Sequence, residues 1–205
     1  MDEKGGKIRA GEENGARNHF TARGGPWIET IHQHPIQVPM IYLVGVDHQV
    51  QHDGPTMIPE REKAISGFSH FLEAKAIELR ISLMAEEFNE EAMNRNHATK
   101  STVRQVAKCL GLRHLFCDPT TIQRRDLGIH KDQNLREEYW LSRLNGYVKT
   151  ETILFVCGAG HLNTCYDKLT HRGLRVVILQ EQFGIGLPPP ILFTNNEAIT
   201  QELEL

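Results

Sequence analysis

Long apolar runs and paired cysteines are both scarce in this 205-residue chain. No stretch approaches the roughly 20 consecutive apolar residues of a membrane-spanning helix, and the first fifteen residues, MDEKGGKIRAGEENG, lack the apolar core of a secretory signal. The 4 cysteines form no Cys-x-x-Cys pair, the spacing typical of zinc ribbons and redox sites. We therefore expect a cytoplasmic protein with free thiols and no membrane partner.

An excess of positive charge is absent as well. The chain has 23 Lys and Arg against 26 Asp and Glu, for a net charge of -3. Duplex nucleic acid is usually bound by a basic surface, so the composition argues against that partner. The length and the 40% hydrophobic content fit one globular domain.

The sequence divides into three segments. Residues 1–39 show no sustained helical or strand period, and Met40 stands directly before the first strong strand pattern. We expect residues 1–39 to be a disordered or irregular arm, or to lie outside the native protein because the start is mis-assigned. An α/β catalytic domain over residues 40–182 and a C-terminal tail over residues 183–205 would follow.

The central segment alternates between two kinds of pattern. Apolar runs typical of strands cover residues 41–46, 81–85, 115–117, 153–157 and 176–179. Most are continuously apolar, as in parallel strands covered on both faces. Apolar residues recur at helical spacing over residues 65–79, 103–110, 135–148 and 162–169, with Ser101 as a possible N-cap of the second helix. This order predicts an open, mostly parallel α/β sheet of about five strands with helices on both faces.

Titratable side chains follow four of these strands at the point where each strand ends. They are Asp47 and His48, Glu86 and Glu87, Asp118, and His161 after Gly158 and Gly160. The carboxyl ends of parallel strands share one edge of a sheet, where ligands bind, and neighbouring strands lie about 4.8 Å apart. Burying unpaired charge costs several kcal/mol, so packing alone does not explain this pattern. We therefore predict an active site at this edge.

The chemistry of this residue set has two interpretations. Two imidazoles with carboxylates suit a divalent ion such as Zn, Mn or Fe. They equally suit a metal-free Glu–His pair that activates water. Gly45 and Gly158 lack a side chain, so a ligand or the backbone can approach closely there.

The motifs GVDH at residues 45–48 and GAGH at residues 158–161, with acidic residues between them, resemble those of the TraB/TIKI superfamily. That group includes TIKI-type metalloproteases, erythromycin esterases and ChaN-like proteins, and the resemblance spans about residues 41–180. It implies His48 and His161 as metal ligands or acid/base groups, with Glu86 or Glu87 as the central carboxylate. The chain lacks the signal and membrane segments of those relatives, which leaves the substrate class open.

The resemblance and the strand ends together predict a hydrolase. A metal held by His48, His161 and a carboxylate, taken as Glu86, would lower the pKa of a bound water. Glu86, Glu87 or Asp47 would accept its proton. Guanidinium groups suit an anionic small molecule, and the predicted substrate-binding set is Asp118, Arg124, Arg125, Arg136, Gly45, Gly158 and Gly160. Phosphoester, ester and peptide cleavage all remain open, as does the oligomeric state.

Two alternatives involve binding. Residues 156–181 run strand, Gly-x-Gly, helix, strand, with Glu181 about 20 residues after the glycines, which is similar to a dinucleotide-binding fingerprint. Asn163 replaces the third glycine of that fingerprint. A non-catalytic sensor could use the same crevice for a nucleotide or a small anion.

Overall fold

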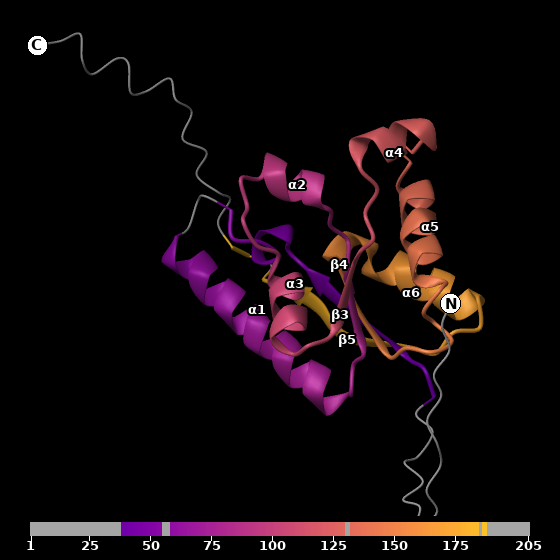
Figure 1. The fold of residues 1–205 in the computed structure, drawn as a ribbon, viewed down its shortest axis with the longest axis horizontal. Coiled ribbons are helices and arrows are strands. Elements are labelled where there is room, and N and C mark those ends of the chain that lie inside the picture. The colour runs from indigo at the N-terminus through magenta and orange to yellow at the C-terminus, as the bar shows by residue number, and fades with distance from the viewer. Residues whose placement is uncertain (1–37, 55–57, 130–131, 185, 188–205) are drawn as a thin grey trace, which may run out of the picture. The chain divides into compact units, whose positions relative to one another are not determined.

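The computed structural model describes residues 38–54, 58–129, 132–184 and 186–187, so the predictions for most of the N-terminal arm and of the C-terminal tail lie outside the described residues. Five parallel strands form one sheet in the order β3-β2-β4-β1-β5 (Figure 1). The strands are β1 (Ile41–Val46), β2 (Leu83–Glu86), β3 (Arg113–Phe116), β4 (Ile153–Gly158) and β5 (Val176–Phe183). The predicted fold class is therefore confirmed.

Six α-helices and two short 3-10 helices connect the strands in the described part of the chain. They are α1 (Pro59–Glu78), α2 (Glu90–Arg95), α3 (Thr102–Cys109), α4 (Thr121–Asp126), α5 (Gln133–Leu144) and α6 (Leu162–His171), with η1 (His48–Val50) and η2 (Ala159–His161). Ser101 caps α3 as predicted, because its hydroxyl accepts from the Arg104 N–H at 3.1 Å. The sequence did not predict α2 and α4, since 6 residues are too few to show a helical period. Their starts are instead marked by side-chain caps, Asn89 and Thr120.

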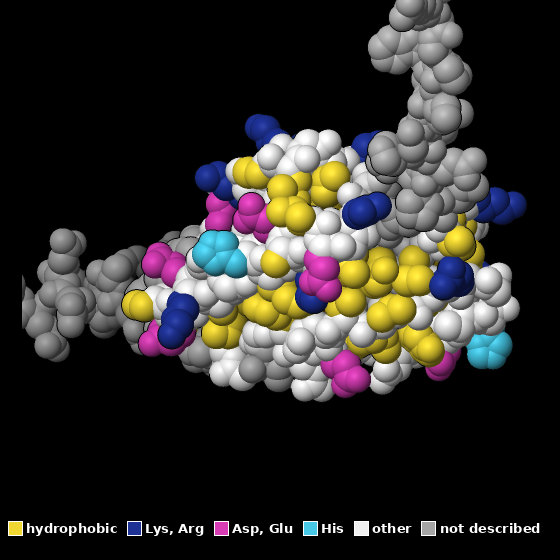
Figure 2. All heavy atoms as spheres, turned by 90° about the horizontal axis from the view of Figure 1, so that it is seen from below, with side chains coloured by type: hydrophobic (Ala, Val, Ile, Leu, Met, Phe, Trp, Pro, Cys, Tyr) yellow, Lys and Arg dark blue, Asp and Glu magenta, His cyan; other side chains and the backbone are white. Residues whose placement is uncertain are grey.

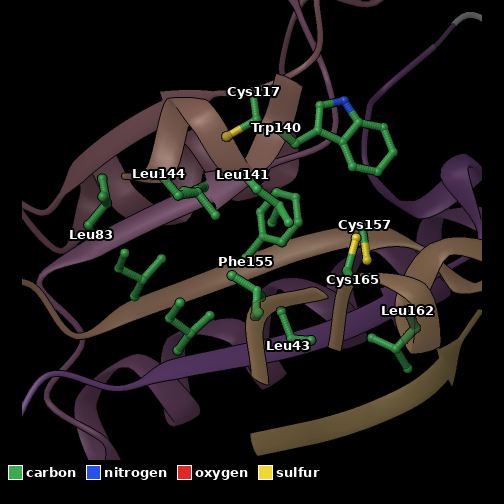
Figure 3. Packing of buried hydrophobic residues seen from close by; sticks show 14 residues of the cluster. Leu43, Leu83, Cys117, Trp140, Leu141, Leu144, Phe155, Cys157, Leu162 and Cys165 are labelled. Atoms are coloured by element: carbon green, nitrogen blue, oxygen red, sulfur yellow. The ribbon is translucent and has the colours of Figure 1, made fainter. Parts of the chain in front are cut away.

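Alternate strand residues face two separate helical layers. On one face, α1 and α3 bury Phe68, Leu72, Val103 and Val106 against Val44, Met84 and Val156. On the other face, α5 and α6 bury Trp140, Leu141, Leu144, Leu162 and Cys165 against Leu43, Leu83, Phe155 and Cys157 (Figures 1 and 3). Both faces of the sheet are thus apolar, which explains the unbroken hydrophobic runs.

Strand β4 is the centre of the sheet, and all 6 of its residues are buried. It pairs with β1 so that Gly158 lies opposite Val46, and with β2 so that Val156 lies opposite Glu86. The carboxyl ends of these three strands therefore reach the same edge. The residues that follow them, rather than the strands themselves, build the site.

The cysteines are free, as predicted. Cys117, Cys157 and Cys165 are buried, whereas Cys109 is exposed. The sulfurs of Cys157 and Cys165 lie beside each other between β4 and α6 (Figure 3). Burial raises the pKa of the Cys117 thiol, so this group stays protonated and packs as a small apolar side chain.

Hydrophobic side chains form a band across the face drawn in Figure 2, with basic and acidic side chains interspersed around it. This face therefore carries no concentration of one sign of charge. Among the described residues, no helix combines the length and the apolar character needed to cross a bilayer.

Candidate active site

Glu87, the residue directly after β2, is the centre of the site. Its side chain is buried, and its Oε2 accepts the backbone N–H of Gly158 at 2.8 Å. Its other oxygen, Oε1, faces two imidazoles, with His48 Nε2 at 4.0 Å and His161 Nε2 at 3.9 Å. The structure thus brings together three residues that the sequence proposed for catalysis, one each from the ends of β1, β2 and β4.

Each imidazole is held by a second side chain through its Nδ1 atom. His48 Nδ1 lies 2.6 Å from Gln51 Oε1, and His161 Nδ1 lies 2.8 Å from Glu137 Oε1. Both partners are acceptors, so they place the proton of the neutral ring on Nδ1. The Nε2 lone pairs of both rings are then directed toward Glu87.

Glu137, on α5, is a partner that the sequence analysis missed. It is 4% exposed and also accepts from Lys168 Nζ at 2.6 Å and from Thr164 Oγ1 at 2.7 Å. Burial alone would raise the pKa of Glu137, but the hydrogen bonds from Lys168, Thr164 and His161 outweigh it and lower the pKa. The carboxylate therefore remains charged and fixes the His161 ring.

Arg136 connects Glu87 to Asp118. Its Nη2 lies 2.9 Å from Glu87 Oε1, while its Nε donates to Asp118 Oδ1 at 2.7 Å. The contact with Glu87 is an ion pair without hydrogen-bond geometry, since Oε1 has no hydrogen-bond partner among the described residues. Trp140 also donates to Asp118 Oδ1, and Arg124 donates to Asp118 Oδ2. Asn89 Nδ2 donates to Oδ2 as well, at 3.4 Å, so Asp118 is a buried acceptor for four side-chain donors.

A cavity of about 460 Å³ opens beside this group. Five of the predicted residues line it: His48, Glu87, Asp118, Arg124 and Arg136. Four further basic residues line it that the sequence analysis did not assign to the site: His52, Arg61, Arg95 and His97. They come from the segment after β1, from α1 and from the end of α2, so no local motif marks them.

Glu86 does not join the group around Glu87. Its Oε1 accepts from the Ser101 hydroxyl and lies 2.8 Å from His114 Nε2, in a buried network on the α3 side. Successive residues of an extended chain point to opposite sides, so Glu86 and Glu87 serve different layers. The predicted metal set of His48, His161 and Glu86 is therefore not assembled.

Six other predicted site residues do not line the cavity. Of these, His161 and Gly158 contact Glu137 and Glu87 as described above, and the remaining four lie elsewhere. Asp47 caps η1 by accepting from the Gln49 N–H at 2.9 Å, and exposed Arg125 pairs with Asp126 at 3.4 Å. Gly45 packs against β5, where an added Cβ would lie 2.1 Å from the Glu181 carbonyl oxygen. Gly160 is exposed, and an added Cβ would meet nothing within 4 Å.

Glu87 provides a better donor than Glu86 for the divalent ion predicted from the sequence. Two ligands on a tetrahedral ion with bonds of about 2.1 Å stand about 3.4 Å apart, compared with 4.0 and 3.9 Å for the two Nε2–Oε1 distances. As arranged, the described residues contain no group of three or more His, Cys, Asp or Glu that could hold a metal ion. The His48 side chain is 53% exposed, and its Nε2 would have to lie closer to Glu87 Oε1 before both atoms could bind one metal ion.

The arrangement of residues 156–181, the segment similar to a dinucleotide-binding fingerprint, is unfavourable for binding a dinucleotide. The Gly158 N–H, which a pyrophosphate would need, already binds Glu87. Strand β5, which carries Glu181, is separated from β4 by β1. Both features weigh against the dinucleotide alternative.

Comparisons of the chain with protein-family models, with curated proteins and with solved structures find no significant match.

Proposed function

We propose that the protein is a hydrolase that activates a water molecule between His48, Glu87 and His161. The convergence of two imidazole Nε2 atoms on one buried carboxylate oxygen, beside a cavity, is the observation that carries this proposal. Two lone pairs and a carboxylate oxygen are all acceptors. A water molecule is the donor that complements them.

In the proposed reaction His48 is the general base, because it lines the cavity and its side chain is half exposed. Its Nε2 takes a proton from water while the water oxygen bonds to the carbonyl carbon or phosphorus of the substrate. The ester bond to the leaving oxygen then breaks, and that oxygen takes the proton back from the imidazolium. General acid–base catalysis of this kind contributes typically 10²–10⁴-fold to the rate.

The surrounding residues position and stabilise this centre. Gln51 and Glu137 hold the two rings through Nδ1, and Gly158 holds Glu87. Arg136, 2.9 Å from Glu87 Oε1, provides positive charge beside the substrate oxygen on which negative charge develops. Each of these contacts is made before the substrate arrives.

A divalent ion held by His48, His161 and Glu87 would, when bound, supply acidity to water in the same place. The resemblance to the TraB/TIKI superfamily supports both the hydrolytic reaction and the role of the two histidines. Membership of that superfamily stays a proposal for this chain.

The experiment is a hydrolysis assay on p-nitrophenyl acetate, p-nitrophenyl phosphate and a fluorogenic peptide, with purified protein. Expected is turnover of at least one substrate, reduced at least about 100-fold by His161→Ala and by Glu87→Gln. His171→Ala is the matched control, since His171 lies on the exposed side of α6, where its Nδ1 bonds the Asp167 carbonyl. Turnover unchanged in the Glu87 variant would overturn the proposal.

The metal is tested separately by elemental analysis of the parent and of the same variants. Near-stoichiometric metal in the parent, lost in His161→Ala and Glu87→Gln, would establish His161 and Glu87 as ligands. Turnover by metal-free protein that resists EDTA would assign the reaction to the imidazole and carboxylate alone.

A further inference from the structure

We infer that the substrate of this site carries a phosphate group, and that Arg124 and Arg136 hold it as a pair oriented by Asp118. The inference rests on the proposed hydrolase function and names its substrate class. Within it, Asp118 is a positioning residue, whereas the two arginines contact the substrate.

The charge of the cavity favours an anion. Its lining contains the arginines Arg61, Arg95, Arg124 and Arg136 but only two carboxylates, Glu87 and Asp118. The whole chain has a net charge of -3, so this excess of positive charge is local. A cleft lined by one sign of charge raises the local concentration of an oppositely charged substrate.

The two arginines are brought together by one carboxylate. Arg136 donates to Oδ1 of Asp118 and Arg124 donates to Oδ2, so the two guanidinium groups lie on either side of the same group. Arg124 also donates through Nε to the Pro119 carbonyl at 3.2 Å. A guanidinium has five N–H donors, and these bonds leave several on each arginine for a ligand. Both side chains line the cavity.

The pair is held rigidly before any ligand binds. The Arg136 guanidinium lies 4.9 Å from the centre of the Trp140 ring, which itself donates to Asp118. Asn89 donates to the Pro119 carbonyl at 2.9 Å, and Thr120 and Gln123 form a capping box at the start of α4. Donors fixed in advance lose little freedom on binding, which favours a compact oxyanion such as phosphate.

The position of the pair relative to Glu87 makes the phosphoryl group the reacting one. Arg136 contacts both Asp118 and Glu87, so a phosphate on this arginine lies next to the water site. Water oxygen would form a bond to phosphorus, the ester P–O bond would break, and the water proton would pass through His48 to the leaving alcohol. A cavity of about 460 Å³ leaves room for an organic group beyond the phosphate.

The test measures binding of inorganic phosphate by calorimetry, without turnover. We expect the parent to bind phosphate, and Arg124→Gln to bind it at least 10-fold more weakly. Arg125→Gln is the matched control, because Arg125 is the next residue on α4, is exposed, and pairs with Asp126.

Two variants keep the test informative if one of them fails to fold. Arg136→Gln leaves Glu87 without its arginine partner and leaves Asp118 with Arg124 alone, so Arg136→Lys is measured beside it and should retain part of the affinity. Equal phosphate affinity in the parent and in Arg124→Gln would overturn the inference, and so would acetate competing as well as phosphate. Neither outcome contradicts the hydrolase proposal if the parent still cleaves an uncharged ester and Glu87→Gln does not.

Discussion

The backbone N–H of Gly158 donates to Oε2 of Glu87 at 2.8 Å, although the two residues are 71 positions apart in the sequence. The same glycine also faces the His48 ring. A Cβ added to residue 158 would lie 2.7 Å from His48 Nε2 and 3.4 Å from Glu87 Oε2. Gly158 therefore leaves the space in which His48 and Glu87 face each other.

Gly158→Ala should reduce hydrolysis at least 10-fold with little loss of stability. The added methyl group meets the free end of a half-exposed imidazole, which can turn away, so the fold can accommodate it while the site cannot. Turnover and thermal unfolding of the same preparation would measure both effects. Gly160→Ala is the control, because a Cβ there meets nothing within 4 Å.

Gly45→Ala should act in the opposite way and destabilise the fold. An added Cβ would lie 2.1 Å from the Glu181 carbonyl oxygen, a backbone atom that cannot move without separating β1 from β5. Overpacking of this kind costs typically 1–3 kcal/mol. Urea unfolding would measure the loss of stability. A urea midpoint equal to that of the parent would contradict the view that Gly45 is needed for the close contact between β1 and β5.

Glu137→Gln should reduce turnover by about 10–100-fold, the usual cost of removing a residue that orients a catalytic or ligating histidine. The amide keeps the shape of the side chain but removes the charge that holds the Nδ1 proton of His161. Turnover measured across a pH series would distinguish this role from a general loss of stability. Glu138→Gln provides the comparison, since Glu138 is 42% exposed and pairs with Arg172 on the surface.

The stability of the protein should fall between about pH 6.5 and pH 4 partly because of His52. Burial, reinforced by the nearby charge of Arg61, lowers the pKa of His52 to about 4, while Asp53 acts in the raising direction and His48 in the lowering one. The unfolded chain binds this proton near pH 6.5 and the folded chain only near pH 4, so acidification favours unfolding across this window.

His52→Gln should therefore lose less unfolding free energy than the parent over the same window. Urea midpoints at pH 7.5, 5.5 and 4 would show the difference, with His70→Gln, an exposed histidine of α1, as the reference. Parallel curves for the parent and the His52 variant would rule out this contribution.

The strands and the longer helices could be predicted because their signals are local. Apolar runs marked all five strands, although the run at residues 115–117 covers only the last two residues of β3, and a serine at residue 101 marked the start of α3. The short helices α2 and α4 left no periodic signal. Their capping residues, Asn89 and Thr120, were visible in the sequence but were not used.

The candidate site was only partly predictable, because the way the strands and helices pack determines which of its side chains contact one another. A sequence shows two consecutive glutamates, and only the phase of the strand decides that Glu87 faces the histidines while Glu86 faces Ser101 and His114. The same limit applies to the arginines. Arg124 and Arg125 are neighbours in the sequence, yet only Arg124 lies on the inner side of α4.

The two Gly-x-x-His motifs likewise have different reasons for their glycines. Gly45 admits the backbone of β5, whereas Gly158 admits the imidazole of the other motif. The histidines converge although their glycines serve separate purposes.

The sheet order also determines when the site can form during synthesis. Strands β1 and β2 are consecutive in the sequence, but β4 lies between them, and Ile153 pairs with both Ile41 and Leu83. Until the ribosome has released residues 153–158, the nascent chain has two strand edges without their common neighbour, and long-range pairing of this kind is slow. The same six residues that join the two halves of the sheet also bring Gly158 to Glu87. A fragment that ends before Ile153 therefore lacks the central strand and the N–H that binds Glu87, and its unpaired strand edges make it prone to edge-to-edge aggregation.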